Sequence, residues 1–273
     1  MKETAILVMS PEMVALYLAH MEQEGKAHKT IRSHLSAISF KFRLHNITDP
    51  MKFALVDKTI QGIKNRYLSS NNSQPRKPID KPLLSRLVNV IPSCAANPYE
   101  RAMFHAVFLL AHFACLRAGE ISLSNNKEHM LQSEQFTREV SQGGASYTVH
   151  FATYKHSNHQ TPQIKLCSSP DPNLCPVSAL DTYLSLRGTF KGPLMQSPSG
   201  KPLTRYRLAQ FLRSCLTLCN EQPDLYGTHS FRIGRATQLA EEHAADVTIR
   251  SAGRWNSNAF KSYIRPSTFT APS

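Results

Sequence analysis

The sequence contains no long apolar run. A transmembrane helix needs about 20 consecutive apolar residues, and no stretch of the 273 residues provides them. We therefore expect no membrane-spanning helix. The chain is nevertheless long enough to bury a sizeable core, and 41% hydrophobic residues are typical of a globular protein rather than a disordered one.

Acidic residues are scarce. There are 19 Asp and Glu against 32 Lys and Arg, which gives a formal net charge of +13. An excess of this kind indicates a polyanionic partner, and the missing apolar run favours nucleic acid over a membrane. On charge alone, a protein that is simply basic and soluble remains the alternative.

Spacings typical of metal sites are also missing. Among the six cysteines, Cys215 and Cys219 lie four positions apart, but no second pair of ligands follows them. His156 and His159 lie in a polar stretch, for which a plain loop is the simpler interpretation. We expect no metal and no cofactor, and we interpret the cysteines as reduced thiols of an intracellular protein.

A polar segment over residues 71–78 is typical of an interdomain linker, because it has two prolines and no apolar anchor. Apolar periodicity and start signals predict helices on both sides of it. They cover residues 10–24, 28–45, 51–68, 81–90, 99–116, 177–187, 204–219 and a stretch that begins near 229. Alternating patterns predict a hairpin of strands over 147–151 and 163–166. The expected fold is mainly α with a small β-sheet: a helical domain over residues 1–70 and a mixed α+β domain over 79–273.

Two stretches contain basic residues without acidic ones, from Gly25 to Thr48 and between Asp181 and Glu221. A solvated helix face normally mixes both signs, so these stretches suit a phosphate backbone. An ordinary exposed basic face is the alternative. The candidate DNA-binding residues in these stretches and elsewhere are Lys29, Arg32, Arg43, Lys64, Arg66, Arg205, Arg207, Arg213 and Arg254.

The C-terminal stretch 228–266 concentrates residues with chemical potential. His229 and Arg232 lie one helical turn apart, and Trp255 precedes Tyr263, which has basic neighbours. A phenol is largely un-ionised at neutral pH and needs cations or a base to attack phosphorus. Arginine forks, an imidazole and an indole N–H suit the charged oxygens of a phosphoryl transition state. These residue types therefore point to a phosphodiester that is attacked by a tyrosine.

Two upstream features supply what this stretch lacks. Arg117 ends an apolar helix, a costly position unless the charge is paired or faces a ligand, and Glu120 is its natural partner. A purely structural ion pair is the alternative. Lys155, between the two predicted strands, is the candidate acid that protonates the leaving 5′ oxygen, with Lys165 and Lys127 as nearby alternatives.

The ordered set of Arg-x-x-Glu, hairpin lysine, His-x-x-Arg, Gly-Arg-Trp and tyrosine resembles the tyrosine recombinase (phage integrase) family. The matching segments are CLRAGEISL (115–123), LCPVSALDTYL (174–184), HSFRIGRATQLA (229–240) and GRWNSNAFKSYIR (253–265). TIRSHLSAI (30–38) resembles the N-terminal core-binding domain of the family. The sequence is most similar to the recombinases of eukaryotic mobile elements of the DIRS, Ngaro and Crypton types.

The resemblance implies a role for each matched residue. The tyrosine would form a 3′-phosphotyrosyl link, the first two arginines would hold the scissile phosphate, and the lysine would be the general acid. The histidine and tryptophan would complete the site, and the glutamate would steady the first arginine. The implied catalytic set is Tyr263, Arg117, Arg232, His229, Trp255, Lys155 and Glu120.

The resemblance also implies a function and its partners. We expect a site-specific DNA recombinase of a mobile element, with a SAM-like core-binding domain and a catalytic domain. Its partner would be double-stranded DNA, bound by a homo-tetramer across two sites. It would be intracellular, and nuclear in a eukaryotic host. The alternatives are a catalytically idle DNA-binding protein derived from such an element and a type IB topoisomerase.

Overall fold

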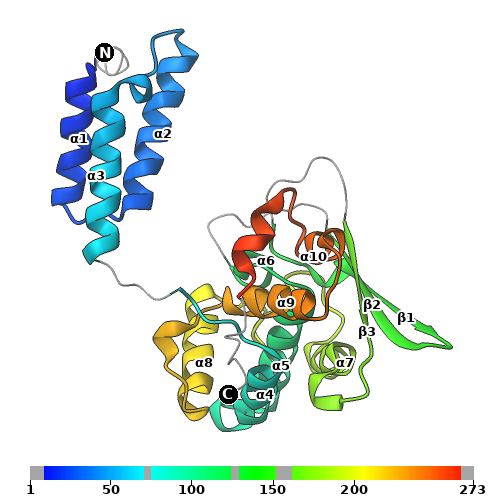
Figure 1. Cartoon of the computed structure of the whole chain (residues 1–273). Coiled ribbons are helices and arrows are strands. Elements are labelled where there is room, and N and C mark those ends of the chain that lie inside the picture. Colours follow the sequence, from blue (N-terminus) through cyan, green and yellow to red (C-terminus); the bar gives the residue numbers. More distant parts are fainter. Residues whose placement is uncertain (1–8, 71–74, 124–128, 152–161, 266–273) are drawn as a thin grey trace, which may run out of the picture. The chain divides into compact units, whose positions relative to one another are not determined.

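The computed structural model describes residues 9–70, 75–123, 129–151 and 162–265 (Figure 1). The chain divides into two compact units, Met1–Gln74 and Pro75–Ser273. Each unit has its own hydrophobic core. In the described part of the chain, no helix is long and apolar enough to cross a membrane.

The first unit consists of three helices and a short 3-10 turn. They are α1 (Pro11–Gln23), α2 (His28–Leu44), η2 (Pro50–Lys52) and α3 (Ala54–Ser70). The start of α1 follows from its sequence, because Ser10 Oγ accepts a hydrogen bond from the Met13 N–H and Pro11 occupies the first turn. Leu18, Ile31 and Ile63, one from each helix, are at most 1% exposed and hold the bundle together.

The second unit is built around one apolar helix, α5. Its helices are α4 (Lys81–Cys94), α5 (Pro98–Phe113), α6 (Ala118–Ile121), α7 (Pro176–Arg187), α8 (Arg205–Leu218), α9 (Ser230–Glu241) and α10 (Asp246–Gly253), followed by the 3-10 helix η7 (Asn258–Tyr263). Phe104 of α5 stacks on Phe211 of α8, with ring centroids 3.6 Å apart. Since α5 also packs against α4, α7 and α9, it is central to the core.

The end of α5 corrects the sequence-based prediction of a helix over 99–116. The helix ends at Phe113 because Cys115 adopts a left-handed backbone conformation with φ of 46°. That turn redirects the chain and makes Arg117 the residue that precedes α6. The arginine therefore starts a new helix instead of ending an old one.

A three-stranded antiparallel sheet accompanies the helices, in the order β1 (Phe136–Ser141), β2 (Gly144–His150), β3 (Gln163–Cys167). Strands β2 and β3 confirm the predicted pair, in a register that places Thr148 opposite Lys165. Strand β1 was missed because most of its residues are exposed, which leaves no apolar alternation to detect. The expected mainly α fold with a small sheet is confirmed.

The segment before α4 is fixed to the start of α9 and to the chain just before it. The Lys77 N–H donates to the Leu225 carbonyl (2.8 Å) and the Ile79 N–H to the Ser230 carbonyl (3.0 Å). Gly234 allows this approach, because a Cβ there would lie 1.8 Å from the Ile79 carbonyl oxygen. The end of the expected 71–78 linker thus belongs to the second unit and supports the helix that carries Arg232.

Candidate active site

A cavity of about 460 Å³ opens in the second unit. It is lined by Arg117, Ala118, Gly119, Glu120, His129, Arg205, Thr228, His229 and Tyr263. Four of the seven predicted catalytic residues therefore face one space, although they come from two stretches of chain more than 100 positions apart. Arg232 and Trp255 pack directly behind this wall.

Glu120 holds Arg117 through two contacts. Its Oε2 accepts from the Arg117 backbone N–H (2.7 Å) and its Oε1 from Arg117 Nη1 (3.1 Å). The Arg117 side chain is 24% exposed, whereas Glu120 is 2% exposed. The predicted orienting pair is thus present, and it leaves the guanidinium accessible from the cavity.

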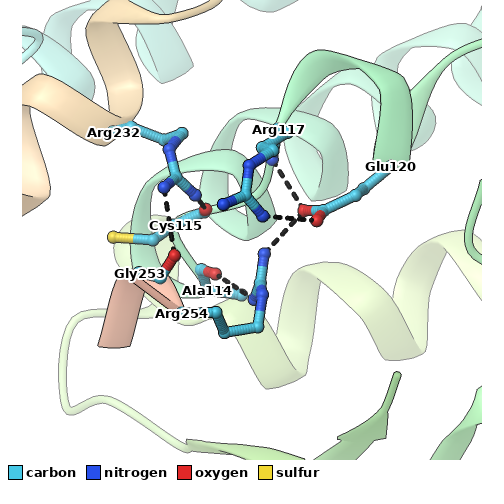
Figure 2. Close-up of polar contacts among 7 residues, drawn as sticks. All are labelled: Ala114, Cys115, Arg117, Glu120, Arg232, Gly253 and Arg254. Carbon is cyan, nitrogen blue, oxygen red and sulfur yellow. Dashed lines mark hydrogen bonds and ion pairs between the residues drawn. The ribbon is translucent and has the colours of Figure 1, made fainter. Parts of the chain in front are cut away.

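Arg254 requires a correction, because it was predicted to bind DNA. Its side chain is 2% exposed, and its Nη2 donates to Glu120 Oε2 at 2.6 Å (Figure 2). Its Nη1 donates to the Ala114 carbonyl (3.3 Å), and the guanidinium lies 3.9 Å from the Phe151 ring centroid. Since both terminal nitrogens of Arg254 are bonded inside the protein and the side chain is buried, it offers no group to DNA.

Arg232 lies beneath the cavity wall and is 1% exposed. Its Nη1 donates to the Cys115 carbonyl and its Nη2 to the Gly253 carbonyl (3.0 Å), as Figure 2 shows. Its Nε has no partner among the described residues. Burial lowers the pKa of Arg232, but an arginine remains charged at neutral pH. The positive charge of Arg232 therefore contributes to the electrostatic potential of the cavity, although its side chain is buried beneath the cavity wall.

Aromatic rings enclose this buried charge. The Arg232 guanidinium carbon lies 4.6 Å from the Trp255 ring centroid and 5.6 Å from that of Tyr263. The two rings meet edge to face, 5.0 Å apart. This packing holds the half-buried Tyr263 ring against the Arg232 guanidinium, which is itself shielded from solvent.

His229 completes the wall beside the tyrosine. Its ring centroid lies 4.8 Å from that of Tyr263. Partial desolvation, followed by the positive charges of Arg232, Arg117, Arg76 and Arg265, lowers the pKa of His229 to about 4. At neutral pH the imidazole is uncharged, so it can donate one hydrogen bond and accept another.

Of the three candidates for the general acid, only Lys165 is among the described residues. Lys155 and the alternative Lys127 fall outside the described residues. The other alternative, Lys165, is on β3, where its Nζ lies 3.2 Å from Glu139 Oε2 with both side chains at least half exposed. Its ammonium is thus engaged in a surface ion pair.

The remaining DNA-binding candidates are exposed on their units. Arg66 forms two hydrogen bonds with Glu22 (2.9 and 2.7 Å), and Arg43 lies 3.8 Å from Asp49. Both arginine side chains are 65% exposed, and ion pairs at the surface contribute only about 0–1 kcal/mol.

In the second unit, Arg205 faces the cavity itself. Arg207 and Arg213 pair with Glu100 (2.5 Å) and Asp224 (2.7 Å). The sequence stretch without acids therefore does not produce a surface without acids. Lys29, Arg32 and Lys64 stay predicted contacts of the first unit.

Sequence reasoning missed His129 and Thr228 as cavity residues. Thr228 precedes His229 and could have been found from that neighbour. His129 had no motif around it, and only the fold brings it to this wall.

No protein-family model matches the sequence, and no curated protein matches it. Solved structures do match. The Tn1549 transposon integrase in complex with a circular intermediate DNA is 13% identical, with a TM-score of 0.62 over 96% of this chain and 83% of that one. The XerH site-specific recombinase, in a post-cleavage complex with difH, is 16% identical, with a TM-score of 0.66 over 94% and 69%.

This chain has the fold of the tyrosine recombinases. A lambda integrase dimer bound to a core site agrees, at 15% identity and a TM-score of 0.54 over 95% of this chain and 65% of that one. The tyrosine recombinase fold extends over both units, since each match covers at least 94% of the chain. The fold that the motifs implied is therefore confirmed.

Proposed function

We propose that this protein cleaves and rejoins DNA strands through a covalent tyrosine intermediate, as a site-specific recombinase. The observation that carries this proposal is the position of Tyr263. Its ring lines the same cavity as Arg117 and His229, and the buried Arg232 lies 5.6 Å from its centroid. A phenol surrounded by cations is suited to attack a phosphodiester.

The proposed step breaks one P–O bond and forms another. Tyr263 Oη gives up its proton to solvent water and attacks the scissile phosphorus, a 3′-phosphotyrosyl bond forms, and the bond from phosphorus to the 5′ oxygen breaks as that oxygen takes up a proton. Lys155 is the proposed proton donor. Attack by a 5′ hydroxyl on the phosphotyrosine reverses the step and rejoins DNA, so the bond energy is conserved and no cofactor is consumed.

The other residues would stabilise the charge that develops on the phosphoryl oxygens. Arg117 is the accessible donor, and each preorganised donor of this kind contributes roughly 10²–10³ in rate. Neutral His229 would add one hydrogen bond, and Trp255 would complete the site. Direct contact by Arg232 would use its unpartnered Nε or exchange a bond that it now makes to a carbonyl.

A covalent-trapping assay tests this proposal. In a nicked suicide substrate, cleavage releases the short downstream fragment that carries the free 5′ hydroxyl. Religation then has no nucleophile, and the phosphotyrosine is trapped. We expect an adduct with the wild type, and none with Tyr263→Phe at undiminished DNA binding. Tyr206→Phe is the control, because that side chain is 72% exposed and does not line the cavity. An undiminished adduct in Tyr263→Phe would refute the assignment.

The resemblance in the motifs supports a finer assignment. We propose a mobile-element recombinase of the DIRS, Ngaro or Crypton kind that acts on double-stranded DNA as a homo-tetramer, in the nucleus if its host is eukaryotic. The XerH and Tn1549 integrase structures contain DNA, which supports the choice of partner. In the trapping assay, no adduct with the wild type would indicate an idle DNA-binding protein. Relaxation of supercoils without joining of two duplexes would indicate a type IB topoisomerase.

A further inference from the structure

Three arginines meet at the turn between Cys115 and Glu120. Arg117 and Arg254 bond to Glu120, and Arg232 bonds to the Cys115 carbonyl (Figure 2). Two of them are assigned above to the phosphate. The third, Arg254, is buried against Glu120 and has no role in the proposed cleavage step.

The carboxylate divides its oxygens between the arginines. Glu120 Oε1 accepts from Arg117 Nη1, whereas Oε2 accepts from the Arg117 backbone N–H and from Arg254 Nη2 at 2.6 Å. Only one side-chain nitrogen of Arg117 is therefore bonded to Glu120. If Oε2 were released, it could take a second N–H from Arg117, because arginine and carboxylate readily form a two-bond fork.

The backbone is bent to bring Arg254 to this place. Arg254 has φ 54° and ψ 49°, a left-handed conformation that costs about 1–2 kcal/mol for a residue other than glycine. Strained residues of this kind persist where the surroundings hold them, often at functional sites. Here the Ala114 carbonyl, the Phe151 ring and Glu120 hold the side chain.

We propose that Arg254 is a positioning residue for Arg117. By occupying Oε2 of Glu120, it prevents a two-bond fork between Glu120 and Arg117. Arg117 then keeps its remaining N–H donors for a DNA phosphate in the cavity. The inference rests on the proposed strand-cleavage function and adds a residue that touches neither DNA nor the tyrosine.

The test compares Arg254→Met with wild type on the suicide substrate. The adduct rate at saturating DNA should fall by about 100-fold or less, the loss expected when a catalytic group is misplaced by roughly 1 Å. DNA affinity should be unchanged, because Arg254 is buried. Arg138→Met is the matched control, since Arg138 is an exposed arginine paired with Asp181 on the surface, and its adduct rate should equal that of wild type.

A second substrate separates positioning from a general structural effect. A methylphosphonate at the scissile position replaces one charged oxygen by a methyl group, so cleavage depends less on the Arg117 donors. The ratio of the adduct rates of wild type and Arg254→Met should therefore be smaller on the methylphosphonate substrate than on the ordinary phosphate substrate. A general structural defect would leave the gap the same on both substrates and would overturn the proposal.

Conservative variants keep the test decisive if Arg254→Met does not fold. Arg254→Lys keeps a cation near Oε2 and should restore most of the adduct rate that Arg254→Gln loses. Equal adduct rates in Arg254→Lys and Arg254→Gln would overturn the proposal. An Arg254 variant that binds DNA more weakly but forms the adduct at the wild-type rate would also overturn it. If the wild type forms no adduct, the proposed function itself is refuted. If the wild type and the Arg254 variants form the adduct at the same rate, only the role of Arg254 is refuted.

Discussion

Arg254 and Glu120 form an ion pair of 2.6 Å in which each side chain is only 2% exposed. The two residues lie 134 positions apart in the sequence. The pair joins the start of α6 to the end of α10, so it connects the stretch that carries Arg117 with the stretch that carries Tyr263. No local sequence motif contains this contact.

Removal of Glu120 should therefore be costly. In Glu120→Ala the buried Arg254 loses its counter-charge, and breaking such a pair typically costs about 3–5 kcal/mol of folding free energy. Glu139→Ala is the control, because its ion pair with Lys165 is at least half exposed and should be worth about 0–1 kcal/mol. Urea unfolding of both variants measures the difference. Equal losses would show that Glu120 is not a buried counter-ion.

Gly253 should tolerate no side chain. A Cβ at this position would lie 1.8 Å from the Trp255 ring, so Gly253→Ala must displace the indole from Arg232 and Tyr263. Overpacking of this kind costs about 1–3 kcal/mol. Trp255 is the sole tryptophan, so its fluorescence emission reports the displacement directly, and we expect a red shift. Gly143→Ala is the control, since the nearest atom there is 3.8 Å away. An unchanged emission spectrum in Gly253→Ala would contradict the packing.

His112 should make the protein sensitive to acid. It is fully buried, and burial lowers its pKa to about 4. Between pH 6.5 and 4 the unfolded chain binds a proton at this residue and the folded chain does not. The free energy of unfolding therefore falls as the pH falls, by about 1.4 kcal/mol per pH unit from this one proton. His112→Gln should show a flatter dependence in urea unfolding at pH 7, 6 and 5. Identical slopes for the two proteins would contradict a neutral buried His112.

His229 should titrate far from the ordinary histidine range. In the free protein its resonance should shift with a midpoint near pH 4, because of partial desolvation and four nearby arginines. A bound DNA phosphate would offset those charges and raise the midpoint. NMR titration with and without an oligonucleotide measures both values, and His229→Gln assigns the resonance. A midpoint near 6.5 without DNA would contradict the electrostatic description.

Local patterns predicted much of this molecule. Periodicity located the longer helices, since an apolar stripe such as that of α2 is repeated within a few residues, but it did not predict the short helices α6 and α10. The pairing of Arg117 with Glu120 was also predictable, because the two lie three positions apart. The cavity residues Tyr263 and His229 were found from their chemical types.

Tertiary effects explain the errors. The helix end at Phe113 depends on the left-handed backbone conformation of Cys115. Such turns are usually predicted from a glycine, and this position has none. Arg254 was predicted as a DNA contact, but it is buried against Glu120, which is distant in sequence. Arg207 and Arg213 likewise meet acids from other segments. The absence of acidic residues from a sequence stretch therefore does not show that its basic residues lack acidic partners in the folded protein.

The most direct measurement of the central claim is the identity of the residue that carries DNA. The trapped wild-type adduct can be digested with nuclease and protease, and its peptides sequenced by mass spectrometry. We expect a nucleotide remnant on Tyr263, attached through a 3′ phosphate. A remnant on any other residue, or a link to a 5′ phosphate, would contradict it.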